Sequence, residues 1–211
     1  MMLPTHAIGG MLVALPVALA MPELSSTALV AGFLGGVLPD LDMYVGHRKT
    51  LHYPVYYSVA GGIGVLAALL VPSTSAAALA SLFLAAAVHC VADAYGGGLE
   101  LRPWEGTSRR AVYDHYHGRW IAPRPGVRYD GSPSDLLLAT VLAVPLLVVV
   151  DAPYSWLVAG SLTVAAVYTA VRRTLPALVE RLVSALPTWT RPYLPARYRI
   201  DGPTLTSPRD D

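Results

Sequence analysis

Residues 35–52 read GGVLPDLDMYVGHRKTLH and lie between two long apolar stretches. This polar segment holds two carboxylates, two histidines, an arginine and the only lysine of the chain: Asp40, Asp42, His47, His52, Arg48 and Lys49. Such a mixture suits a metal-binding segment at a membrane surface, because imidazole nitrogens and carboxylate oxygens together bind divalent ions. The plainer interpretation is a polar loop that connects two membrane helices.

The composition of the chain indicates a membrane protein. Of its 211 residues, 54% are hydrophobic and only 14% are charged, while glycine and proline are frequent. Both residues are more common in membrane helices than in soluble ones, and the length suits one domain. The single cysteine, Cys90, excludes a disulfide within the chain, and its apolar surroundings predict a small buried hydrophobe.

Six apolar runs predict an all-α, polytopic membrane protein with about six transmembrane helices. The runs cover residues 7–21, 24–38, 54–71, 76–95, 136–150 and 154–171. Because a bilayer core needs about 20 residues at about 1.5 Å rise each, the first two runs are short. They predict either thin spanning helices or a hairpin that dips into the membrane. In both cases His6 and Asp40 return to the same face.

Local signals mark several helix ends. Pro54 suits the first turn of a helix, residues 73–75 supply capping hydroxyls, and the glycines at 96–98 permit a left-handed cap. From Leu99 to Ser134 the chain is polar, aromatic and rich in arginine, proline and glycine. This composition predicts one long loop, and loops of that length are uncommon unless they are functional or disordered.

The C-terminal part differs from the membrane runs. Leu178, Leu182 and Leu186 recur at intervals of four with polar residues opposite them, which predicts an amphipathic helix in the membrane interface. From Thr188 onward the proline-rich tail is expected to be flexible. The predicted parts are a membrane-embedded helical domain, its cytoplasmic loop, and an interfacial helix with its tail: residues 1–171, 96–134 and 172–211.

The basic residues predict the orientation. With six crossings and a cytoplasmic N-terminus, the external turns at 22–23, 72–75 and 151–153 contain no lysine or arginine. All basic residues then fall on the cytoplasmic side, as the positive-inside rule requires. The prediction is a multi-pass protein of the inner or plasma membrane with both termini in the cytoplasm. Because no basic residue precedes the first apolar run, that run is expected to be retained rather than cleaved as a signal peptide.

This topology brings polar residues from four segments to the cytoplasmic face. The candidate metal ligands are His6, Asp40, Asp42, His47, His52, His89 and Asp93. His89 and Asp93 are four residues apart and share one helix face, and ionisable groups inside an apolar run are functional hypotheses by default. The donors suit a divalent ion, zinc or manganese above all, with Asp42 and His52 as the catalytic candidates that move protons. Taken singly, most of these residues could equally cap or solvate a helix end.

Other polar residues give weaker signals. His115 and His117 could bind a second metal, protonate a leaving group or simply occupy a loop, and we favour the loop. The loop arginines Arg102, Arg109, Arg110 and Arg119 have a geometry suited to phosphate, but anchoring at lipid headgroups is the preferred interpretation.

The order of these motifs resembles a known family. The motifs are Thr5-His6 with Gly9-Gly10, Pro39-Asp40-Leu41-Asp42, His47-Arg48 with Thr50 and His52, and His89-x-x-x-Asp93. Over roughly the first half of the chain, this set resembles the LexA-regulated, inner-membrane metal-dependent hydrolases. The resemblance implies a polytopic helical protein with metal-dependent hydrolase activity. Lys49, Tyr53 and residues 95–98 depart from the family pattern but leave the proposed ligands in place.

The leading functional hypothesis is a metal-dependent hydrolase at the cytoplasmic membrane face that acts on a phosphoester of a lipid or nucleotide. A metal-free lipid phosphatase is less favoured, because Arg119 stands where an acid is expected four residues after His115. A metal transporter should bind near the bilayer midplane, whereas these ligands cluster at one end. A metal sensor or a non-enzymatic membrane protein is a further alternative. The bilayer is the one partner that can be inferred, and no nucleic acid is expected.

Overall fold

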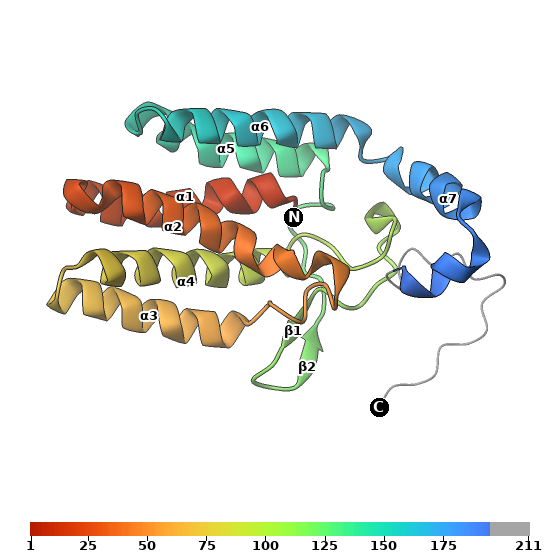
Figure 1. Ribbon diagram of the computed structural model, residues 1–211, viewed down its shortest axis with the longest axis horizontal. Helices are drawn as coiled ribbons and strands as arrows, with labels where there is room; N and C mark the ends of the chain where they lie inside the picture. The colour runs from red at the N-terminus through yellow and green to blue at the C-terminus, as the bar shows by residue number, and fades with distance from the viewer. Residues whose placement is uncertain (195–211) are drawn as a thin grey trace.

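A computed structural model describes residues 1–194 and consists mainly of helices (Figure 1). Its α-helices and strands are α1 (Leu3–Ala20), α2 (Ser25–Val37), α3 (Pro54–Leu70), α4 (Thr74–Asp93), β1 (Val112–Asp114), β2 (Arg119–Ile121), α5 (Pro133–Val149), α6 (Tyr154–Val171) and α7 (Leu175–Ala185). Short 3₁₀ segments cover Pro22–Leu24, Leu38–Tyr44, Pro103–Glu105 and Thr188–Tyr193. The part of the predicted flexible tail beyond residue 194 lies outside the described residues.

The first six helices form three pairs with their long axes side by side (Figure 1). The central pair, α1 and α2, packs against α4 on one side, and α1 packs against α5 on the other. The outer pairs are α3 with α4 and α5 with α6. The connections after α2 and after α4 meet near the start of α1, at one end of the bundle (Figure 1). Polar residues that are distant in the sequence therefore gather at that end.

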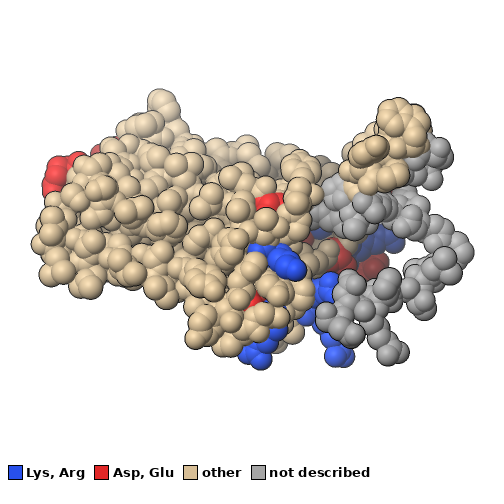
Figure 2. Space-filling view, turned by 60° about the horizontal axis from the view of Figure 1, so that its bottom comes forward, with Lys and Arg blue, Asp and Glu red and all other residues tan. Residues whose placement is uncertain are grey.

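Within residues 1–194, four helical stretches are long and apolar enough to cross a membrane: Leu3–Ala20, Pro22–Tyr44, Thr74–Asp93 and Tyr154–Val171. The helices α3 and α5 are also apolar but contain only 17 residues each. The predicted helical membrane class agrees with these findings, while the number of six crossings stays a prediction. On the face seen in Figure 2, residues other than lysine, arginine, aspartate and glutamate cover most of the body, and lysine and arginine gather toward one end.

The central pair packs backbone against backbone at small residues. A Cβ atom added at Gly36 of α2 would collide with the carbonyl oxygen of His6 in α1, and one at Gly10 of α1 would collide with the carbonyl oxygen of Gly32. Small residues allow such close approach in membrane helix pairs. This packing fixes the end of α2, and with it the segment that carries the first two carboxylates, against the start of α1.

Several predicted helix ends are confirmed. Pro54 is the first residue of α3, and the Ser73 hydroxyl caps α4 by accepting a hydrogen bond from the backbone nitrogen of Ala76. The prediction for the end of α4 was wrong in detail, because the helix ends at Asp93 with Ala94 in a right-handed conformation, and the left-handed φ of +92° occurs only at Gly97. Asp93 therefore lies at the end of the bundle where the connections after α2 and α4 meet.

The region predicted as one long loop between α4 and α5 contains regular structure. Strands β1 and β2 form an antiparallel hairpin in which Val112 pairs with Ile121 and Asp114 with Arg119. The backbone nitrogen of Tyr113 donates a hydrogen bond of 2.9 Å to the carbonyl oxygen of Arg48. The hairpin is thus attached to the polar segment after α2, a long-range contact that local composition could not reveal.

Candidate metal centre

The candidate ligands come from four places at the same end of the bundle. His6 lies in the first turns of α1, Asp40 and Asp42 lie in the 3₁₀ segment after α2, and His47 and His52 lie in the connection to α3. His89 and Asp93 occupy the last two turns of α4. All of them are buried except His47, whose side chain is 20% exposed.

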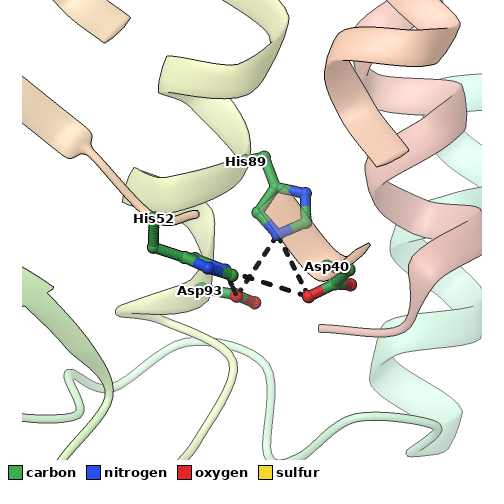
Figure 3. A group of neighbouring side chains, drawn as sticks. All are labelled: Asp40, His52, His89 and Asp93. Carbon is green, nitrogen blue, oxygen red and sulfur yellow. Dashed lines mark hydrogen bonds and ion pairs between the residues drawn. The ribbon is translucent and has the colours of Figure 1, made fainter. Parts of the chain in front are cut away.

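Four of these residues point potential metal-ligand atoms toward one another (Figure 3). They are Asp40, His52, His89 and Asp93, and one ligand atom from each lies within 4.8 Å of all the others. His89 Nε2 is 3.4 Å from both Asp40 Oδ1 and Asp93 Oδ2, and His52 Nε2 is 3.8 Å and 3.2 Å from the same two oxygens. A tetrahedral zinc site with bonds of about 2.0–2.1 Å has ligands about 3.3–3.4 Å apart. The cluster therefore has the size and the donor chemistry to hold a metal ion.

The orientation of His89 is fixed by a backbone carbonyl. Its Nδ1 lies 2.7 Å from the carbonyl oxygen of Gly36, and because a carbonyl can only accept, Nδ1 carries the proton. The neutral ring then presents an unprotonated Nε2 to two carboxylate oxygens, and this buried atom has no hydrogen-bond partner among the described residues. Lone pairs that face one another in a buried site need a cation between them, which is either a proton on Nε2 or a metal ion.

Asp42 holds His52 in a similar way. Its Oδ2 lies 3.0 Å from His52 Nδ1 and also accepts a hydrogen bond from the backbone nitrogen of Leu51. Its Oδ1 lies 3.1 Å from His47 Nδ1 and accepts a hydrogen bond from the backbone nitrogen of Arg48. A carboxylate that binds one imidazole nitrogen leaves the other available and is the usual outer partner of a metal-binding histidine. Asp42, a predicted ligand, thus lies behind the cluster and orients His52.

His6 supports the opposite side of the cluster. Its ring stacks on that of His89 with a centroid distance of 3.6 Å, and its Nε2 lies 2.9 Å from Asp93 Oδ1. The nitrogen of Met1 also donates a hydrogen bond of 2.7 Å to Asp93 Oδ1. Since these contacts use Oδ1, they leave Oδ2 of Asp93 facing His52 and His89. His6 was predicted as a ligand, and the geometry makes it a partner of Asp93.

Arg48 is part of the site although the sequence assigned it no role there. It is buried, adopts a left-handed backbone conformation with a φ of +60°, and places Nε 3.3 Å from Asp93 Oδ2. Its Nη1 donates a hydrogen bond of 2.7 Å to the carbonyl oxygen of Gly97. The available signal was its position directly after His47, but a basic residue beside a membrane helix is ordinarily read as a headgroup anchor.

The two remaining histidines lie outside the cluster. His115 Nε2 is 2.6 Å from the carbonyl oxygen of Lys49, and His117 Nδ1 is 2.6 Å from Asp114 Oδ2. Desolvation raises the pKa of Asp114, but hydrogen bonds from the side chain and backbone of His117 outweigh it and hold the pKa below its ordinary value. These contacts stabilise the hairpin and its attachment, which agrees with the structural interpretation of both histidines.

Comparison with known proteins gives no assignment. No family model matches the chain, and no curated protein or solved structure matches it. The geometry of the cluster is therefore the main feature of this protein that bears on its function.

Replacing Asp42 with asparagine is expected to weaken metal binding without removing a ligand. The amide cannot act as the anionic acceptor for His52 Nδ1, and loss of such an outer partner lowers metal affinity about 10–100-fold. The measurement is zinc affinity by competition with a chromophoric chelator. Asp114→Asn, which alters the hairpin carboxylate that faces His117, is the matched control and should keep wild-type affinity. An Asp42→Asn protein with unchanged affinity would exclude this orienting role.

Proposed function

We propose that the protein is a multi-pass membrane protein with six crossings that uses a divalent metal ion to hydrolyse a phosphoester at the cytoplasmic membrane face. The observation that carries the proposal is the buried Nε2 of His89, which faces carboxylate oxygens of Asp40 and Asp93 at 3.4 Å. The resemblance to the LexA-regulated, inner-membrane metal-dependent hydrolases supports the same assignment.

The residues present fit a transition metal. Two imidazole nitrogens and two carboxylate oxygens are a donor set for zinc or manganese rather than calcium. Asp40, His52, His89 and Asp93 would hold the ion. When bound, such an ion supplies Lewis-acid chemistry for hydrolysis at neutral pH.

Proton transfer is best assigned to His47. The side chain of His52 is fully buried and its Nδ1 is bound to Asp42, whereas the side chain of His47 is 20% exposed. His47 Nδ1 lies 3.1 Å from Asp42 Oδ1 and 3.9 Å from Asp40 Oδ1. It therefore borders the cluster and can exchange protons with solvent, as a general acid or base must. In this assignment Asp42 orients both histidines.

The proposal predicts phosphate release that depends on added metal. Purified protein would be stripped with a chelator, reloaded with zinc or manganese, and tested on a panel of lipid and nucleotide phosphoesters. His47→Gln should lower the turnover at least about 100-fold, the smaller end of a general acid–base contribution, and should keep its metal. His117→Gln is the control outside the cluster and should leave turnover unchanged.

Two results would refute the hydrolase. One is turnover that survives chelation, and the other is metal-loaded protein that hydrolyses nothing in the panel. Zinc flux into liposomes without hydrolysis would indicate a transporter instead.

A further inference from the structure

A cavity of about 440 Å³ adjoins the cluster of Asp40, His52, His89 and Asp93. Asp40, His47 and Arg48 line it where it meets the cluster. The rest of its wall comes from the start of α1, Met43, residues 98–101, the second half of α6, the start of α7, and the ion pair of Asp130 with Arg172. Its volume lies within the range of small-molecule sites, about 300–1,000 Å³.

Away from the cluster, the wall of this cavity is mainly apolar. Its apolar side chains include Leu3, Leu101, Val164, Leu175, Pro176 and Val179. Such a surface favours a hydrocarbon over water, because burial of apolar area is the dominant favourable contribution to association. A nucleotide would leave these side chains without a complementary group.

The cavity also borders the surface that would face lipid. Val164 lines the cavity and is 59% exposed, and it belongs to α6, which is long and apolar enough to cross a membrane. The adjoining helix α7 contributes Val179 to the cavity and leaves Leu178 51% exposed. A molecule from the bilayer could therefore reach the cavity without passing through water.

The end of the cavity nearest the cluster offers polar partners. Arg48 brings a guanidinium, whose positive charge and planar geometry suit phosphate oxygens; its Nε also lies 3.3 Å from Asp93 Oδ2, and its Nη1 donates to the carbonyl oxygen of Gly97. Glu100 lines the cavity too, and its buried Oε2 accepts no hydrogen bond from any described residue. A hydroxyl or ammonium group on the polar part of a ligand would satisfy that oxygen.

From this arrangement we propose that the cavity binds the hydrocarbon chain of an amphiphile whose phosphoester lies beside Asp40, His47 and Arg48. The inference rests on the proposed function and narrows its substrate to a membrane lipid. The chain would lie between α1, α6 and α7, and the bond to be cleaved would lie at the cluster.

The test is photolabelling in lipid nanodiscs with hexadecyl phosphate that carries a diazirine near the end of its chain. Labels should map by mass spectrometry to the cavity wall, with dodecyl phosphate competing and butyl phosphate failing to compete. Leu175→Trp and Val179→Trp fill the cavity and should reduce this labelling at least about tenfold, since excluding two methylene groups from an apolar site costs that factor. Leu178→Trp, on the same helix but outside the cavity, is the matched control.

The inference is overturned if both filled variants label like wild type, if labels fall only on the outer helix surfaces, or if butyl phosphate competes as well as dodecyl phosphate. Its failure can be separated from failure of the hydrolase, because labelling needs no turnover. Cavity labelling in protein that hydrolyses nothing would keep the chain site and reject the hydrolase. Metal-dependent hydrolysis of soluble phosphoesters without cavity labelling would keep the hydrolase and reject the hydrocarbon-chain site.

Discussion

His89→Ala is expected to lower metal affinity by more than about 100-fold, the upper end of the effect of an outer partner, because it removes a ligand itself. The variant also leaves oxygens of Asp40 and Asp93 facing a gap where Nε2 had been. Metal content after reloading with zinc, followed by chelator competition, measures the loss.

The control for this variant is His117→Ala, which removes a histidine that contacts Asp114 on the hairpin. It should bind metal like wild type. Circular dichroism should show that both variants keep their helices. Equal metal affinity in His89→Ala and wild type would reject the centre, and so would a wild-type protein that takes up no zinc or manganese.

Gly36→Ala should destabilise the helix bundle and weaken the metal site together. The added methyl group would collide with the backbone of α1 at His6, and overpacking of this kind typically costs about 1–3 kcal/mol. Any shift of α2 also moves the Gly36 carbonyl that accepts the hydrogen bond from His89 Nδ1. Thermal unfolding in detergent and zinc affinity should therefore both fall.

A matched control exists in α3. A Cβ atom added at Gly62 meets no other atom within 4 Å, so Gly62→Ala should keep or raise the stability, as alanine is the better helix former by about 1 kcal/mol. If Gly36→Ala unfolds at the wild-type temperature, then the close packing of α1 on α2 is not what fixes the site.

Much of the helical framework could be predicted from the sequence, because helix ends and apolar runs are local signals. The apolar run from Tyr154 to Val171 is helix α6 to the residue, and Pro54 begins α3 as expected. The hairpin was not predicted. Its strands are only three residues long, and β1 is attached through Tyr113 to the backbone of Arg48, a contact that no local pattern encodes.

The site was predictable as a set of residues but not as a set of roles. The spacing of His89 and Asp93 and the topology indicated which side chains would meet, and the structure brings four of the seven predicted ligands into one cluster. Which nitrogen of a histidine faces the cluster depends on what binds the other nitrogen. For His89 that partner is the backbone carbonyl of Gly36, 53 positions away in the chain. Every residue has such a carbonyl, so the sequence does not indicate which one will accept the hydrogen bond.

The segment between α2 and α3 contains no α-helix, yet it carries Asp40, Asp42, His47, Arg48 and His52. An ion held by Asp40 and His52 on this segment and by His89 and Asp93 on α4 would act as a cross-link, comparable to a disulfide in closing loops of the chain. Closing a loop lowers the conformational entropy of the unfolded chain and so stabilises the folded state. This stabilisation increases slowly with loop length. The four residues that would hold the ion would therefore also fix the longest connection among the first four helices.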